Sequence, residues 1–317
     1  MQTFEERRFD QAILASPDQI LVATDLDDGD YLIPHIVAQA KASNSHVTLV
    51  HGVLPANLML ADPAGYGFVV PPTEDSELQV SLDAMAAKIR EHGISCDAVL
   101  EHGYAVDVIR KHIELTHANR LIMGTHGRGK LGQMVLGSVA SDLIRVVDIP
   151  ILAIGPRARI TPGHETPRSI LHPVSLRGHY LKTAEFAMDL AQACRAELTL
   201  LHVLDPDDRE IPELGMSVWA KDALSALAPN GEDLVPPIYT SVVYGDRVEE
   251  ILNAASRTDA DWIVLGVEER VPFWPFQDST AYKIMVAADR PVLSFRYQRR
   301  AAGQEQAYDG QLTHAIV

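Results

Sequence analysis

The residues with the clearest chemical potential lie in a glycine-rich stretch near the middle of the chain. Gly124, Gly127, Gly137 and Ser138 follow a short apolar run, LIM, and precede a segment with helical spacing of apolar residues. Glycine lets backbone N–H groups approach an anion closely, and a helix start adds unpaired N–H groups and the positive end of its dipole. A strand, a glycine-rich loop and a helix start therefore predict a phosphate-binding site.

Two common nucleotide motifs fit this stretch only in part. The segment from Gly124 to Lys130 begins a Walker A loop, G-x-x-x-x-G-K, but Leu131 stands where that loop has its Mg²⁺-binding hydroxyl. Gly127, Gly129 and Gly132 spell G-x-G-x-x-G. A dinucleotide fingerprint opens the first βα turn of its domain, whereas about 120 residues precede this one. We expect neither motif to act here.

A third spacing fits the whole stretch. Gly124, Gly127, Gly137 and Ser138 form G-x2-G-x9-G-S, which resembles the ATP-binding signature of the universal stress protein family. The resemblance covers residues 18–155 well and residues 168–296 more loosely. It implies that the first half holds ATP, with Mg²⁺, through Ala23, Thr24, Asp25, Gly52, Met123, Gly124, His126, Gly127, Arg128, Gly137, Ser138 and Val139.

The polar residues of this set also have ordinary structural interpretations. Asp25 follows the first predicted strand, so it either caps the next helix or, as the resemblance implies, accepts hydrogen bonds from the adenosine part of the nucleotide. Ser138 is a predicted N-cap, a role that is compatible with a phosphate hydroxyl. His126, Arg128 and Lys130 are basic residues in an acidic chain, and they either contact phosphate or belong to a solvated loop.

Two positions near the base depart from the family pattern. Ala23 stands where relatives often have proline, and Gly52 where relatives often have valine. If the backbone at Gly52 makes the contact with adenine, recognition survives. If the contact needs side-chain packing on the base, affinity falls.

The second half of the chain repeats the first. The segment DWIVLG, ending at Gly266, corresponds to NRLIMG, ending at Gly124. We expect two tandem α/β domains, 18–155 and 168–297, joined by the proline-rich linker 156–167. Each is a doubly wound parallel sheet, for which the resemblance implies the strand order 3-2-1-4-5. It also implies that the edge strands Ile149–Ile154 and Pro291–Phe295 pair with each other. The stretch Leu54–Asp75 is expected to be a long loop.

The second half lacks the diagnostic residues of the first. Asp25 is replaced by Ser175, Gly127 by Glu269, and the Gly137-Ser138 pair by Asp278-Ser279. Carboxylates beside a phosphate are strongly unfavourable, so we expect one ATP per chain. The aromatic residues of the second loop either fill the empty site as core or form an apolar patch for a ligand or partner; they are Phe273, Trp274 and Phe276.

Composition restricts the class of protein. The chain has 317 residues and a net charge of −16, which disfavours binding to nucleic acid or to anionic membranes. No apolar stretch is long enough to span a bilayer, so no membrane insertion is expected. Cys96 and Cys194 form no C-x-x-C motif, which favours reduced thiols and a cytoplasmic location. The sequence has no H-E-x-x-H and no G-x-S-x-G motif, and we predict no catalytic residue.

The resemblance therefore implies an ATP-binding regulatory or stress-response protein, in which ATP sets the conformation or the choice of an unidentified protein partner. A homodimer is plausible. One alternative is a slow ATPase or a nucleotidyl-transfer enzyme. Adenylating enzymes on this fold carry S-G-G-x-D-S after the first strand, and the TDLDDGD of this chain disfavours that chemistry. The other alternative is an interaction protein with a vestigial nucleotide site.

Overall fold

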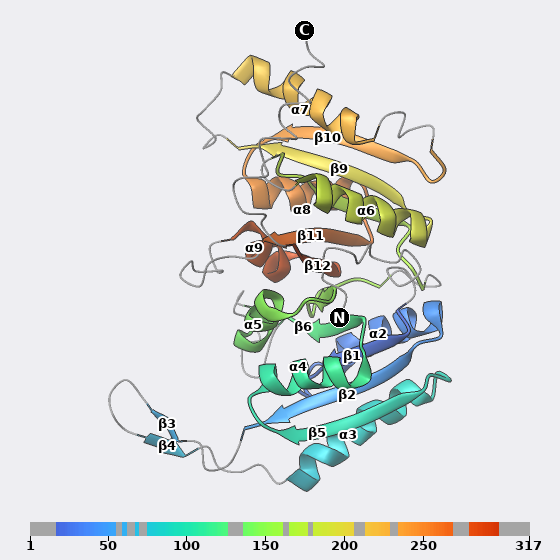
Figure 1. The fold of residues 1–317 in the computed structure, drawn as a ribbon, viewed down its shortest axis with the longest axis vertical. Helices are drawn as coiled ribbons and strands as arrows, with labels where there is room; N and C mark the ends of the chain where they lie inside the picture. The colour runs from blue at the N-terminus through green and yellow to red at the C-terminus, as the bar shows by residue number, and fades with distance from the viewer. Residues whose placement is uncertain are drawn as a thin grey trace.

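Ten strands form one continuous sheet that runs through both halves of the protein (Figure 1). The computed structural model describes residues 17–54, 59–61, 67–69, 75–125, 136–160, 165–176, 180–205, 213–228, 234–268 and 279–297. The strand order is β10-β9-β8-β11-β12-β7-β6-β1-β2-β5. Every neighbouring pair is parallel except β12 and β7, which lie antiparallel at the centre.

The first half contributes five strands to this sheet, in the order β5-β2-β1-β6-β7. Numbered along the chain, this is the predicted 3-2-1-4-5 order, which is confirmed. The elements alternate strand and helix because each buried strand is followed by a segment with an apolar face. They are β1 (Gln19–Ala23), α2 (Gly29–Ser43), β2 (His46–Val53), α3 (Asp75–Arg90), β5 (Cys96–His102), α4 (Ala105–Thr116), β6 (Arg120–Gly124), α5 (Ser138–Val146) and β7 (Ile151–Ile154).

The side chains of each strand alternate between two cores. In β1, Ile20 and Val22 pack with α2 and α3 on one face, whereas Leu21 and Ala23 pack with α4 and α5 on the other. The helices that follow β1 and β6 therefore cover opposite faces of the sheet. This reversal makes the C-terminal ends of β1 and β6 the switch point of the first half.

The second half repeats this architecture in the order β10-β9-β8-β11-β12. The repeat confirms the prediction of two tandem doubly wound α/β units. Its elements are β8 (Ser169–Pro173), α6 (Tyr180–Cys194), β9 (Glu197–Leu204), α7 (Glu213–Leu227), β10 (Ile238–Tyr244), α8 (Arg247–Arg257), β11 (Trp262–Glu268), α9 (Thr280–Ala287) and β12 (Val292–Tyr297).

The two halves join through their edge strands, as expected. Ala153 of β7 pairs with Val292 of β12, and Ile151 pairs with Ser294. Each edge covers the unpaired backbone groups of the other, which removes two open sheet edges. Helices α5 and α9 lie on either side of this seam (Figure 1).

The predicted loop Leu54–Asp75 contains a small hairpin, so that expectation was wrong in part. Strands β3 (Met59–Ala61) and β4 (Gly67–Val69) pair antiparallel in a separate sheet. Each strand has only three residues. Three residues are too few for an alternating pattern to stand out among the surrounding prolines and glycines.

Candidate functional site

The predicted site residues of β1 and β6 meet at the switch point of the first half. Ala23 is the register partner of Met123, so Thr24 and Gly124 leave two neighbouring strands at the same level. Ligands on open parallel sheets bind in the crevice beyond such strand ends. The structure therefore brings together the two strand ends that sequence reasoning had placed at one edge.

Thr24 is engaged by the fold through every polar group it has. Its N–H donates to the Val50 carbonyl at 3.2 Å, and its carbonyl accepts from His51 Nδ1 at 2.8 Å. Its buried hydroxyl donates to Asp28 Oδ1 at 2.5 Å and accepts from the Leu26 N–H at 2.9 Å. The Thr24 side chain therefore holds the β1–α2 turn in shape.

Asp25 is the half-buried carboxylate at the end of β1. Its Oδ1 accepts from the Asp27 N–H at 3.0 Å, as in an Asx turn. The N-cap of α2 is Asp28, so the interpretation of Asp25 as the cap of that helix was wrong. The position of Asp25 at the strand end is compatible with accepting hydrogen bonds from a ligand.

Gly124 is required by the packing of α2 beneath it. A Cβ at this position would lie 2.6 Å from Tyr31 Oη and 3.0 Å from Asp28 Oδ2. The first glycine of the signature thus makes room for the start of α2, in addition to any role in letting a ligand approach. Among the residues that the structure describes, the buried Tyr31 hydroxyl has no hydrogen-bond partner.

The buried carboxyl of Asp28 was missed by sequence reasoning. Burial raises its pKa to about 7, and the charge of Asp25 adds to the rise, while the hydrogen bond from Thr24 opposes it. Burial likewise raises the pKa of Tyr31. The DLDDGD segment looks like an exposed acidic turn, and nothing in its composition distinguishes the acid that turns inward.

Gly52 is also explained by backbone packing. A Cβ on Gly52 would lie 2.9 Å from the Cα of Ala105, at the start of α4. The missing side chain therefore lets α4 approach β2. Whether Gly52 contacts an adenine base, through its backbone or at all, stays a prediction.

Helix α5 begins close to the end of β6, because Gly137 is hydrogen-bonded to Thr125. The Gly137 N–H donates to the Thr125 carbonyl at 2.9 Å, and the Thr125 N–H donates to Ile154 at 2.9 Å, which anchors both ends of the glycine-rich segment. The N-cap is Gly137 and not Ser138, which is the first helical residue and is exposed, as is Val139. Because Gly137 has no side chain, it offers the first N–H groups of α5 no acceptor, which leaves a helix start suited to an anion.

The corresponding strand ends of the second half, those of β8 and β11, have the same backbone hydrogen bonds, but the helix that begins beside them is capped by a side chain. The Val174 N–H donates to Leu201 at 2.7 Å and the Val174 carbonyl accepts from His202 Nδ1 at 2.7 Å, as Thr24 does with Val50 and His51. Ser279 is the N-cap of α9, and its hydroxyl accepts from the Tyr282 N–H at 3.2 Å. Ser175 is exposed at the end of β8. The N-cap of α9 therefore caps the helix with its own side chain, whereas the N-cap of α5, Gly137, has none; in the repeat Ser279 corresponds to Ser138, the first helical residue of α5.

Several predicted residues lie outside the described residues. They are His126, Gly127, Arg128 and Lys130 in the first half, and Glu269, Phe273, Trp274, Phe276 and Asp278 in the second.

The described part of the chain offers neither a cluster of metal ligands nor a membrane-spanning helix. No group of three or more His, Cys, Asp or Glu residues there could hold a metal ion. None of the helices described is long and apolar enough to cross a bilayer. Cys96 and Cys194 are free thiols whose pKa values burial raises to about 11.

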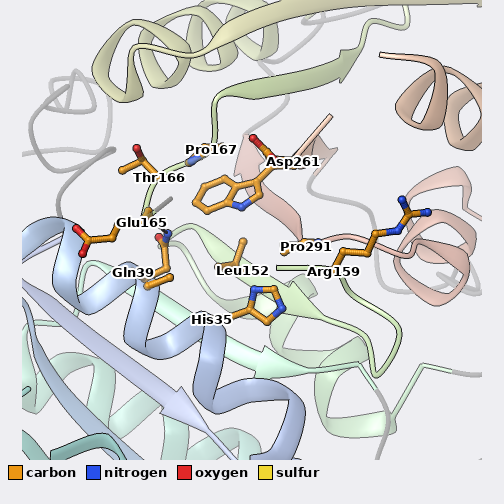
Figure 2. Close-up of a pocket in the computed structure, with 11 residues that line it drawn as sticks. His35, Gln39, Leu152, Arg159, Glu165, Thr166, Pro167, Asp261 and Pro291 are labelled. Carbon is orange, nitrogen blue, oxygen red and sulfur yellow. Dashed lines mark hydrogen bonds between the residues drawn. The ribbon is translucent and has the colours of Figure 1, made fainter. Parts of the chain in front are cut away.

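A small cavity lies between the halves, away from the switch point (Figure 2). It is lined by His35 and Gln39 of α2 and by Pro167, Trp262 and Pro291, near the N-terminal ends of β8, β11 and β12. Its volume of about 30 Å³ holds one or two water molecules. Its size and its position at strand N-termini both separate it from a nucleotide site.

Comparison with known proteins decides the family. The sequence profile described as "Universal stress protein family" matches residues 17–155 and 167–274, which is more than half of the chain. The chain belongs to the universal stress protein family. Members of the family often bind nucleotides. In this universal stress protein the second match ends before α9 and β12, although both elements complete the second repeat.

Individual relatives agree with this assignment. A "Universal stress protein A-like protein" of Arabidopsis thaliana is 26% identical over 81 residues, which is 26% of this chain and 46% of that relative. A universal stress protein from Archaeoglobus fulgidus has a TM-score of 0.64 at 17% identity, over 89% of this chain and 97% of that one. A functionally unknown protein from Pseudomonas aeruginosa has a TM-score of 0.62 at 16% identity, over 90% and 94%. At these identities the solved structures show a shared fold.

Proposed function

We propose that this protein binds ATP, together with Mg²⁺, at the first switch point, and that it acts as a nucleotide-dependent regulator in a stress response. The observation that carries the proposal is the difference between two helix starts. Helix α5 begins at a glycine with no side chain to cap it, whereas α9 is capped by Ser279. The family and its G-x2-G-x9-G-S spacing support the same assignment.

The described residues fit the two ends of a nucleotide. Asp25 offers a carboxylate to ribose hydroxyls or to the adenine amino group, and Ala23 and the Gly52 backbone border the base. The N–H groups at the start of α5, with the exposed Ser138 and Val139, suit the phosphates. His126, Gly127 and Arg128 complete the proposed set from outside the described residues.

Mg²⁺ bound with ATP would neutralise part of the triphosphate charge. This matters here because the turn beside the site is acidic, with Asp25, Asp27 and Asp30 close in sequence. The residues of this chain would supply orientation and anion binding.

Turnover is proposed to be slow. Asp28 has the pKa of a general base, but its carboxyl is buried beneath Gly124 and accepts from Thr24. It is therefore positioned to support the α2 start rather than to activate a water molecule above the strand ends. No described residue favours the enzymatic alternative over regulation by binding.

The proposed setting is the cytoplasm, with an unidentified protein partner reading the nucleotide state. The edge strands β7 and β12 already pair within one chain. A homodimer would therefore use another surface, such as the outer strands β5 and β10.

The test is to identify the nucleotide that the protein carries. The purified protein is denatured, the released small molecules are identified by mass spectrometry, and Mg-ATP is then titrated into nucleotide-free protein. We expect an adenine nucleotide and saturable binding. If no nucleotide co-purifies and the protein does not bind Mg-ATP at millimolar concentration, the proposal is overturned. Turnover near about 10 per second, the median for enzymes, would favour the ATPase instead.

A further inference from the structure

One residue of the second repeat reaches the proposed phosphate-binding segment of the first. The Leu136 N–H donates to Tyr282 Oη at 3.1 Å, across 146 positions of sequence. Leu136 directly precedes Gly137 at the start of α5. The contact therefore links helix α9 to the residue before the proposed anion-binding N–H groups.

The Tyr282 ring is held firmly enough to act as a fixed support. The residue is only 8% exposed and packs in the same core cluster as Leu136 and Ala140. Leu136 is also buried, at 3% exposed. Because both groups are buried, water has little access to the Leu136 N–H and cannot readily replace the Tyr282 hydroxyl as its acceptor.

The other end of α9 is attached to the linker that follows β7. Arg157 Nη2 donates to the Ala287 carbonyl at 3.2 Å, at the end of the helix, where a cation also complements the dipole. The Arg159 N–H donates to the Asp289 carbonyl at 2.9 Å, and the Arg159 and Asp289 side chains form an ion pair. Helix α9 thus contacts the first half through Tyr282, near its start, and the linker through Ala287 and Asp289, at and just beyond its end.

The internal repeat indicates that the second half supports the first through this contact and that the first half has no equivalent residue to support the second. Asp289 corresponds to Asp148 at an offset of 141, and the same offset relates Tyr282 to Ser141. Serine lacks the ring that carries the Tyr282 hydroxyl across the seam. The repeat without the glycine signature therefore supplies the tyrosine, and the repeat with the signature receives it.

We propose that Tyr282 is a positioning residue for nucleotide binding: its hydroxyl holds Leu136 so that the first N–H groups of α5 face the phosphates. The inference rests on the proposed function and assigns the second repeat a part in it. The second repeat then supports the nucleotide site of its neighbour without holding a nucleotide itself.

The test is the full-length Tyr282→Phe variant, which removes one oxygen and keeps the ring. Tyr244→Phe is the matched control, because Tyr244 is 58% exposed on the outer strand β10. Affinity is measured for ATP and for adenosine, and the exchange rate of the Leu136 amide is measured without ligand.

We expect Tyr282→Phe to weaken ATP at least about fivefold, because a buried donor that loses its acceptor shifts the segment out of position. Adenosine, which has no phosphates, should keep its wild-type affinity. The Leu136 amide should exchange faster, and Tyr244→Phe should change none of these quantities. A general loss of structure would instead weaken ATP and adenosine equally.

Wild-type ATP affinity in Tyr282→Phe would overturn the inference, as would an equal loss for ATP and adenosine. If the wild-type protein binds no nucleotide, the proposed function fails, and this result is distinct from a failure of the variant. The support itself is then judged by amide exchange alone: faster exchange at Leu136 upholds it, and an unchanged rate refutes it.

Discussion

The strand ends of the two repeats have the same backbone hydrogen bonds. They differ at the helix that begins beside them, α5 in the first repeat and α9 in the second, because only α9 has a side-chain cap. Thr24 and Val174 make the same pair of hydrogen bonds to the neighbouring strand. Helix α5 then starts at Gly137, whereas α9 starts at Ser279, whose hydroxyl accepts from its own first turn. In the repeat, Gly137 corresponds to Asp278 and Ser138 to Ser279, so α9 begins one residue later than α5 and is capped by the serine that corresponds to the first helical residue of α5.

The comparison also explains why the second repeat remains necessary. Its strand β12 covers the edge of β7, and its helix α9 contacts the segment before α5. Losing the diagnostic glycines does not affect either contact. The second repeat has the residues that complete the sheet and lacks the glycine signature of the first.

The largest expected effect comes from replacing the N-cap residue of α5 by valine. Gly137→Val places a branched side chain over the first N–H groups of α5, and we expect ATP binding to be abolished in a titration. Gly137 has φ −57° and ψ 147°, which valine also adopts, so the backbone is not strained; the loss of stability should stay within about 1 kcal/mol, because valine is a poorer N-cap than glycine. The matched variant Ser279→Val should lose about 1 kcal/mol of stability with the α9 cap and keep ATP binding. Retained ATP affinity in Gly137→Val would place the phosphates elsewhere.

The next effect concerns the buried carboxyl of the first switch point. With its pKa raised to about 7, Asp28 holds a proton in the folded state that the unfolded state has lost above about pH 4. The stabilisation from this proton is fully present below about pH 4 and is lost as the pH rises through 7.

Asp28→Asn keeps an oxygen that accepts from Thr24 and carries no charge. At pH 8 it should be more stable than wild type by up to about 4 kcal/mol, and the difference should shrink towards pH 4. Denaturant unfolding at several pH values measures this, with the exposed Asp27→Asn as control. A difference that does not depend on pH would contradict the account.

The smallest effect is expected at Asp25, on the adenosine side of the site. Asp25→Ala removes a carboxylate that we propose accepts hydrogen bonds from the nucleoside, so affinity for ATP and for adenosine should fall by about 1–3 kcal/mol. The neighbouring Asp27→Ala should leave both affinities unchanged. Equal effects from the two variants would indicate a general loss of negative charge rather than a contact.

Most of the fold was predictable because the same pattern of apolar strands and amphipathic helices occurs in both halves of the sequence. Apolar strands alternate with amphipathic helices, and segments such as DWIVLG and NRLIMG recur at nearly constant spacing. The strand order came from the family resemblance, since periodicity does not determine which strands are neighbours. The hairpin of β3 and β4 was missed because its strands are only three residues long.

The candidate site stays a prediction; the sequence indicated the residues at its strand ends but not the helix packing beneath them. Gly124 and Gly137 stood out by spacing, but the reason that Gly124 is a glycine depends on Asp28 and Tyr31, which α2 brings under β6. Gly52 looked like a departure from the family and is explained by the close approach of α4. These contacts depend on how helices pack on the sheet, which residue spacing does not specify.

The most direct test of the difference between the repeats is the stoichiometry of Mg-ATP binding, measured by titration calorimetry on nucleotide-free protein. A carboxylate about 4 Å from a phosphate charge costs about 4 kcal/mol at an effective dielectric constant of 20. The acidic loop of the second repeat, EER followed later by QDS, should therefore exclude ATP. We predict one ATP per chain, lost entirely in Gly137→Val. A stoichiometry near two, with half of the binding surviving in that variant, would contradict the account.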